Sequence, residues 1–162
     1  MSSDSRIVHA CSYPRAGLIG NPSDGFYGKT IAFIVRNFQA EVTLWESPEL
    51  VIEPNQRDYT NFASLAKLVE NIDAFGYYGG VRLLQASVRR FDHYCQQSAI
   101  PMHSRNFTIR YQSNIPSHVG LAGSSAIITA CFKALMIFYD VTIPPPILAN
   151  LVLSVETEEL LI

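Results

Sequence analysis

The chain has 162 residues, of which 48% are hydrophobic, and its 12 basic and 14 acidic side chains give a formal net charge of −2. A chain of this length fits one domain and buries about two-thirds of its unfolded surface. The near-neutral charge argues against binding to nucleic acid or to an anionic membrane surface.

The three cysteines are widely spaced and form no CxxC pair. This favours reduced thiols in a cytosolic, cytoplasmic protein over a disulfide frame or a zinc site. The N-terminal stretch MSSDSRIVHACSY is polar and lacks the apolar core of a signal peptide. The longest apolar run, AIITACFKALMIFY, is too short to span a bilayer and contains Lys133.

The first motif along the chain is GKT, Gly28 to Thr30, which ends the Walker A pattern of nucleotide-binding loops. The glycine that this pattern requires five positions earlier is replaced by Ser23. A Walker A loop also opens a helix, whereas IAFIV follows here, a β-branched and aromatic run typical of a strand. We interpret GKT as a turn before a strand.

The first half of the chain is predicted to be rich in strands. Residues 30–36 and 38–46 are expected to form an antiparallel pair around Arg36-Asn37, because FQAEVTLWE alternates apolar and polar side chains. ELVIEP predicts a short strand that ends at its proline, and residues 62–75 suggest a helix.

The second half is predicted to be mainly helical. Apolar residues recur every three or four positions over 80–97, which indicates an amphipathic helix, and FTIRY at 107–111 alternates as a strand. SSAIITACFKALMIFY, residues 124–139, predicts a helix. After a break at prolines 144–146, ILANLVLSVETEEL at 147–160 predicts another. Strands first and helices later indicate an α+β fold, a mixed or antiparallel sheet with helices on one face.

The segment NIPSHVGLAGSSAIITACFKAL predicts a strand end, a glycine loop and the start of a helix. Gly120 and Gly123 allow the backbone to turn tightly and to approach a ligand. Ser124 and Ser125 lie at the cap or first turn, where unpaired N–H groups and the helix dipole favour an anion, and a hydroxyl there also suits Mg²⁺. The alternative is that Ser124 is an ordinary N-cap. Because the helix is apolar almost all round, we expect it to be buried, with its N-terminus open to an interior cleft.

This segment resembles the central signature of the GHMP kinases, the superfamily of galactokinase, homoserine kinase, mevalonate kinase and phosphomevalonate kinase. That signature is a proline, a glycine-rich turn and a serine pair opening a helix, here Pro116 followed by GLAGSSA. RAGLIGNPSD, Arg15 to Asp24, is similar to the family's Arg-x-x-Leu-Ile-Gly segment near the sugar site. Within the superfamily, GYYGGVRLL and the two motif regions look like segments of the glucuronokinase subgroup.

The resemblance implies that residues 1–162 form a GHMP kinase N-terminal, ATP-binding domain with the ribosomal protein S5 domain 2-like fold. It also implies ATP- and Mg²⁺-dependent phosphorylation of the anomeric hydroxyl of a sugar acid, D-glucuronate, giving the 1-phosphate. The family continues with a glycine-rich segment, a catalytic aspartate and a second domain, whereas this chain ends at EELLI. We therefore expect a truncated kinase. The alternatives are a non-catalytic nucleotide-binding or interaction domain, or a GHMP kinase acting on another small alcohol or sugar.

The resemblance also implies roles for individual residues. Ser125 and Glu156 are expected to bind Mg²⁺, Arg15 to lie beside the transferring phosphate or the sugar carboxylate, and Asp24 to accept hydrogen bonds from sugar hydroxyls. Each has a plainer alternative: a solvated helix face for Glu156, a surface position for Arg15 and a turn for Asp24. The ATP phosphates are expected to be bound by the backbone of Gly120, Leu121, Ala122, Gly123, Ser124 and Ser125.

Other residues near these motifs are left with open interpretations. Glu156, Glu158 and Glu159 crowd the end of a helix, where the dipole disfavours acids. Either the helix continues in a longer protein, or one acid has a cationic partner. Further candidates are Tyr77 and Tyr78, which flank a ligand or pack in the interior, and His118 in the phosphate loop.

Overall fold

The structure is a computed structural model that describes residues 7–20, 26–55, 58, 62–75, 79–117 and 119–161. Within these ranges, no helix combines the length and the apolar character that crossing a bilayer requires. The elements in chain order are β1 (Val8–Ser12), β2 (Arg15–Ile19), β3 (Ile31–Ile34), β4 (Ala40–Glu46), β5 (Val51–Ile52), α1 (Leu65–Phe75), α2 (Gly80–Gln97), β6 (Phe107–Ser113), α3 (Gly123–Tyr139), α4 (Pro145–Ser154) and the π-helical turn η3 (Val155–Glu159).

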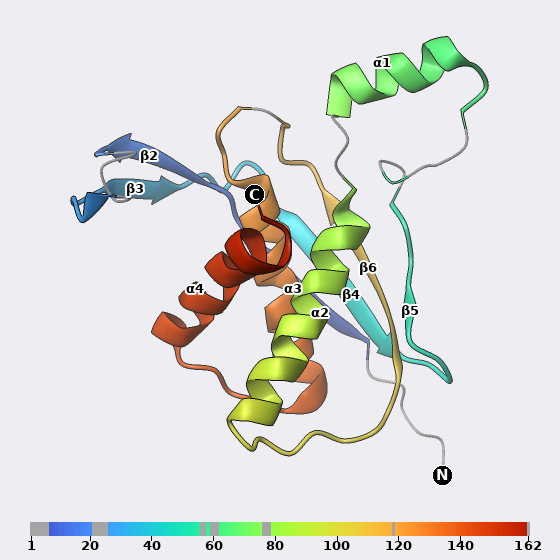
Figure 1. Cartoon of the computed structure of the whole chain (residues 1–162), viewed down its shortest axis with the longest axis vertical. Coiled ribbons are helices and arrows are strands. Elements are labelled where there is room, and N and C mark those ends of the chain that lie inside the picture. Colours follow the sequence, from blue (N-terminus) through green and yellow to red (C-terminus); the bar gives the residue numbers. More distant parts are fainter. Residues whose placement is uncertain are drawn as a thin grey trace.

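The main sheet has four strands in the order β1-β4-β6-β5 (Figure 1). β1 and β6 each pair antiparallel with β4, and β5 runs parallel to β6. The register places Val8 and Ile109 on either side of Leu44, and all three side chains are buried. Since successive strand residues point to opposite faces, this buried row defines the face of the sheet that packs against the core.

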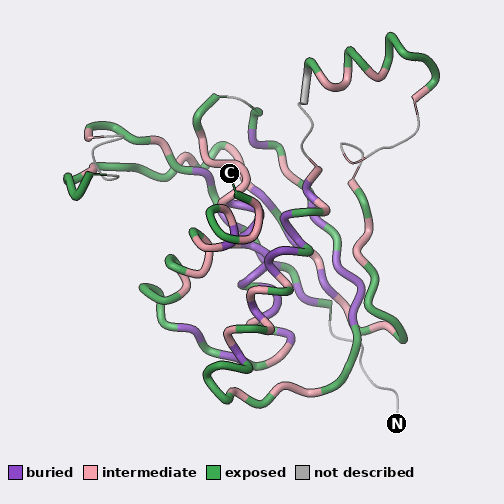
Figure 2. Tube along the Cα trace, viewed as in Figure 1, coloured by how far each residue is buried: buried purple, intermediate pink, exposed green. Residues whose placement is uncertain are grey.

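α2 and α3 cover that face, so the core lies between the sheet and these two helices (Figures 1 and 2). α3 contacts β1, β4 and α2, and Ile128, Phe132 and Leu135 on it are fully buried. The ring of Phe91 on α2 meets that of Phe132 edge-on, with centroids 6.1 Å apart. The α+β prediction and the prediction that this apolar helix is buried are both confirmed.

The predicted pairing of residues 30–36 with 38–46 is wrong, although both strands exist. β3 pairs antiparallel with β2 in a separate two-stranded sheet, whereas β4 pairs with β1 and β6. Arg36 and Asn37 do form a turn. The alternating buried side chains of β4 require a sheet that is covered by helices on one face, while all four residues of β3 are exposed, so the two strands belong to different surroundings.

The β2–β3 hairpin projects from the body of the molecule, and most of its residues are exposed (Figures 1 and 2). Gly28 to Thr30 lead directly into β3, so GKT precedes a strand, as the sequence predicts, and opens no helix.

The helix predicted over 147–160 begins earlier and consists of two parts, α4 and η3. Pro145 and Pro146 occupy the first positions of α4, where the missing N–H costs no hydrogen bond, so these prolines begin the helix. The N–H of Leu160 donates to the carbonyl of Val155 at 3.1 Å, the i→i+5 bond of a π-helix. The last turn of the helix is therefore wider than an α-helical turn.

Candidate functional site

The loop between β6 and α3 reaches the N-terminus of α3 through two residues with left-handed backbone conformation. Gly120 has φ of 73° and Ala122 has φ of 52°. A Cβ at Gly120 would meet no atom within 4 Å, so glycine is favoured there by the backbone conformation. Ala122 is the N-cap of α3, without a side-chain capping bond, and the helix begins at Gly123. The alternative that Ser124 is the N-cap is therefore wrong, because Ser124 lies inside the first turn.

Both serines of that turn donate hydrogen bonds to one carboxylate on η3. The Oγ of Ser124 lies 2.6 Å from Oε1 of Glu156, and the Oγ of Ser125 lies 2.9 and 3.1 Å from its two carboxylate oxygens. Glu156 is half-buried, so the alternative of a solvated helix face is wrong. Three oxygen-bearing side chains thus converge at the positive end of the α3 dipole.

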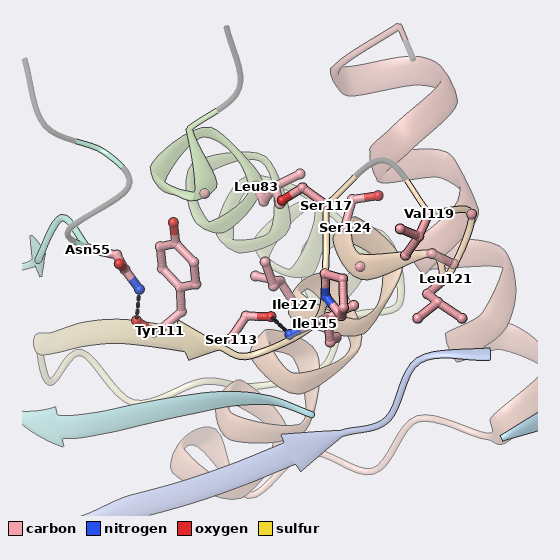
Figure 3. A pocket seen from close by; sticks show the side chains of 15 residues that line it. Asn55, Leu83, Tyr111, Ser113, Ile115, Ser117, Val119, Leu121, Ser124 and Ile127 are labelled. Carbon is pink, nitrogen blue, oxygen red and sulfur yellow. Dashed lines mark hydrogen bonds between the residues drawn. The ribbon is translucent and has the colours of Figure 1, made fainter. Parts of the chain in front are cut away.

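A cavity of about 360 Å³ lies on one side of this helix end. Figure 3 shows Tyr111 and Asn55 on its β6 side, with Ser117 and Ser124 across from them. The Asn55 amide donates to the Tyr111 carbonyl at 3.1 Å. The predicted phosphate loop forms much of the wall, since the lining includes Gly120, Leu121, Ala122, Gly123 and Ser124.

A second cavity, of about 530 Å³, lies on the other side of the helix end. Arg15, at the start of β2, lines it together with Ser125 and Glu156, so three of the predicted site residues lie around one space. Apolar side chains of α4, among them Leu148 and Val152, form another part of the wall. Ala122 lines both cavities, and the two spaces therefore adjoin at the N-terminus of α3.

Four predicted residues fall where the structure gives no description. Asp24, Tyr77, Tyr78 and His118 lie outside the described residues, and their roles stay predictions.

A hydrogen-bonding network beside the first cavity was not predicted from the sequence. The Asp58 carboxylate accepts the hydroxyl of Tyr111 at 2.9 Å and the N–H of Asn55 at 2.8 Å, and it lies 3.4 Å from the N–H of Val81. A Cβ on Gly80 would lie 2.0 Å from Cζ of Tyr111, so the ring packs directly on the helix backbone. The glycine pair in GYYGG was the signal that could have indicated this close approach.

The cationic partners of the last two glutamates were not identified from the sequence either. Glu158 and Glu159 form ion pairs with Arg89 and Arg90 of α2. The hypothesis that an acid at this helix end has a cation is thus confirmed for these two. Glu156 makes no ion pair with any residue that the structure describes.

The described groups with perturbed pKa values lie away from both cavities. Burial raises the pKa of the Cys131 thiol to about 12, although a hydrogen bond with Ser87 opposes the shift. Burial also raises the pKa of Cys95, with a further contribution from Asp92. These thiols are therefore protonated and unreactive near neutral pH.

Comparison with known proteins yields a family for this arrangement. Residues 82–160 match the GHMP kinases N terminal domain. Probable glucuronokinase 2 of Arabidopsis thaliana is 42% identical over 158 residues, covering 96% of this chain and 43% of that protein. Glucuronokinase 1 of the same plant is 44% identical over 150 residues, covering 91% of this chain and 41% of that protein. The chain thus spans about two fifths of the length of these curated relatives.

Solved structures give the same fold. The crystal structure of a D-glycero-D-manno-heptose 1-phosphate kinase from Bacteriodes thetaiotaomicron matches with a TM-score of 0.68 at 15% identity, over 96% of this chain and 49% of that chain. The family resemblance that the two sequence motifs predicted is confirmed. Over residues 82–160 the chain matches the N-terminal domain of the GHMP kinase family.

Proposed function

We propose that the chain, residues 1–162, is the ATP-binding domain of a sugar kinase that phosphorylates the anomeric hydroxyl of D-glucuronate to give the 1-phosphate. The observation that carries this proposal is that two cavities adjoin at the N-terminus of α3, beside Arg15, Ser125 and Glu156. The names of the two curated relatives support a sugar acid as substrate. Because the chain spans about two fifths of their length, the complete activity is proposed for a longer protein.

The first cavity is the proposed ATP site. Its volume of about 360 Å³ suits a small-molecule ligand. Phosphoryl transfer requires mainly that the reactants be positioned and their charge stabilised. The backbone N–H groups of residues 120–125, at the positive end of α3, suit that task for the phosphates. The glycines in this segment bring no side chain between the backbone and the ligand.

Ser125 and Glu156 are the proposed Mg²⁺ ligands, and their chemistry fits this ion. Mg²⁺ prefers oxygen ligands and is usually bound by one or two carboxylates, with phosphates and water completing its shell. Here the Oγ of Ser125 lies 2.9 Å from Oε1 of the Glu156 carboxylate. No group of three or more His, Cys, Asp or Glu is gathered for a metal among the described residues, which agrees with a shell completed by the nucleotide. When bound, the ion neutralises charge on the phosphates.

The second cavity is the proposed sugar site. Arg15 has a planar, permanently charged guanidinium that suits bidentate contact with the sugar carboxylate or with the transferring phosphate. Asp24, which lies outside the described residues, is proposed to accept hydrogen bonds from sugar hydroxyls. The anomeric oxygen forms a bond to the γ-phosphorus as the bond from that phosphorus to ADP breaks, and the hydroxyl proton passes to a base. The family resemblance assigns that base to an aspartate that follows the glutamate helix in the family's sequences.

A coupled assay of ADP release, with glucuronate and MgATP, tests the proposal. It is run on the 162-residue chain and on the same chain extended to the length of its relatives. Turnover by the extended protein is the expected result. If the extended protein released no ADP in the presence of glucuronate, the kinase proposal would be overturned.

Ser125→Ala tests the proposed metal contact in the extended protein. It should reduce kcat more than it raises the KM for glucuronate, because contact with the metal matters most as charge develops in the transition state. Ser154→Ala is the matched control, since the Ser154 hydroxyl donates to the Leu151 carbonyl and lines neither cavity. An unchanged kcat for Ser125→Ala would remove Ser125 from the metal site.

Arg15→Lys should also lower the activity of the extended protein, because a lysine cannot replace a bidentate contact.

A second candidate function is a non-catalytic interaction domain. It is favoured by the exposed apolar side chains of the β2–β3 hairpin, among them Leu18, Ile31 and Phe33. ADP release by the 162-residue chain itself would exclude this candidate.

We also propose a cytosolic location, supported by three cysteines that are all free.

A further inference from the structure

Two arginines of α2 contact the two last carboxylates of η3. A terminal nitrogen of Arg90 lies 2.5 Å from Glu158, and its Nε lies 3.3 Å from Glu159. Arg89 contacts the other carboxylate oxygen of Glu159. The side chains of Arg90 and Glu159 are only 16% and 11% exposed, so this pair is largely removed from water. We call Arg89, Arg90, Glu158 and Glu159 the arginine clamp.

The π-helical geometry of η3 lets one turn face two helices. In an α-helix, with about 100° of rotation per residue, residues 156 and 159 would point only about 60° apart. The wider turn rotates less per residue, so the two directions diverge further. Glu159 consequently reaches α2, while Glu156 reaches the serines of α3.

Charge makes this arrangement depend on the clamp. Three carboxylates lie within four residues at the C-terminal end of a helix, where both their mutual repulsion and the dipole disfavour them. The arginines compensate Glu158 and Glu159, while Glu156 is left with hydroxyl donors. The carboxylate that faces the α3 N-terminus is therefore the one of the three that the clamp leaves available.

We propose that the arginine clamp positions Glu156. By tying η3 to α2, the clamp holds the π-helical turn in the register that presents the Glu156 carboxylate to Ser125, and it thereby sets the affinity of that site for a divalent cation. The inference rests on the proposed function, which takes Ser125 and Glu156 as the Mg²⁺ ligands. None of the four clamp residues lines either cavity, so they act through Glu156 and not by contact with nucleotide or sugar.

Calorimetric titration of the 162-residue chain with ATP tests this without any turnover. The dissociation constant is measured once in Mg²⁺ and once in EDTA, for the wild type, Arg90→Met and Arg90→Lys. Arg90→Met should weaken binding in Mg²⁺ by about 10–100-fold, the usual effect of removing a residue that orients a metal ligand, and leave binding in EDTA unchanged. Arg90→Lys, which keeps the charge, should recover part of the loss. Arg105→Met, which breaks an exposed ion pair with Glu46, is the matched control and should change neither constant.

A double variant separates positioning from general stability. If Arg90 acts through Glu156, then Arg90→Met combined with Glu156→Gln should bind MgATP no more weakly than Glu156→Gln alone. Additive losses, or equal losses in Mg²⁺ and EDTA, would overturn the inference. If circular dichroism shows that Arg90→Met does not fold, Glu159→Gln replaces it, since it removes the charge at nearly constant shape.

The two proposals fail in different ways. If the wild type binds ATP equally in Mg²⁺ and EDTA, the proposed metal site is wrong and this inference falls with it. If the wild type binds ATP more tightly in Mg²⁺ than in EDTA, and Arg90→Met has the same dissociation constants as the wild type, only the positioning role is wrong.

Discussion

Substituting Gly80 by alanine should destabilise the protein, although alanine is the better helix former. The added Cβ would lie 2.0 Å from Cζ and 2.2 Å from the hydroxyl oxygen of Tyr111, so the ring must move. Moving it strains a buried site, at about 1–3 kcal/mol. It also breaks the hydrogen bond from Tyr111 to Asp58, which costs about 1.5–3 kcal/mol for a charged acceptor. After subtracting about 0.5–1 kcal/mol for the helix preference of alanine, the net loss is about 2–5 kcal/mol.

Urea unfolding of Gly80→Ala measures this loss, and Gly123→Ala is its matched control. Gly123 also begins a helix, but its added Cβ would meet Ile115 at 3.4 Å, an ordinary contact. The control should therefore be neutral or slightly stabilising. In a Tyr111→Ala background, which removes the ring, Gly80→Ala should cost almost nothing. A Gly80→Ala protein as stable as the wild type would refute the reasoning, and so would an equal loss in the Tyr111→Ala background.

Three further outcomes are expected. Glu46→Gln should lower the free energy of unfolding by less than about 1 kcal/mol, because its ion pair with Arg105 is exposed, and this difference should vanish in high salt; a loss that persists there would contradict the assignment. A thiol reagent should label Cys11 in the folded chain but Cys95 and Cys131 only after denaturation; equal labelling rates would show that the buried thiols are accessible. Because burial raises the pKa of Cys131 from 9.0 to about 12, the unfolded chain loses this proton first, and stability should fall above about pH 9 by about 1.4 kcal/mol per pH unit. Urea unfolding at successive pH values, compared with Cys131→Ala, checks this, and identical slopes for the two proteins would count against it.

Local chemistry made the glycine loop and the helix that follows it predictable. The stretch from Gly120 to Ser125 combines glycine, small and hydroxylic residues before a helix that is apolar almost all round. Such a helix has to be buried, and its first turn has to meet the loop, so the position of Ser125 near an interior cavity followed from neighbouring residues alone.

The strand partners were not predictable in the same way. β1 and β2 are five-residue strands in a polar N-terminal region, and β1 acquires its partner, β4, only after the intervening hairpin. The predicted pairing of β3 with β4 was wrong because a turn at Arg36-Asn37 has two possible roles. It can close a hairpin, or it can connect a strand of one sheet to a strand of another. Alternation along one strand identifies its buried face but contains no information about which strand lies beside it.

The ion pairs of the arginine clamp could not be predicted from the sequence for a similar reason, because their partners lie far apart along the chain. Arg89 and Glu159 are 70 positions apart, and neither belongs to a motif that names the other. The crowding of acids at the end of the last helix indicated that a cation was needed, but only the packing of η3 against α2 identifies which arginines supply it.

The pairing of β4 with β6 also bears on how quickly this protein reaches its native state. Val42 lies opposite Tyr111, so joining the two central strands closes a long stretch of chain that includes two helices. Closing a long stretch loses chain entropy before the new contacts compensate for it, and proteins dominated by distant pairings fold slowly. α2 and α3 can become helical early, but the loop that leads into α3 follows directly from β6. The loop and helix end of the proposed nucleotide site should therefore form in the slowest refolding phase, together with the closure of the sheet.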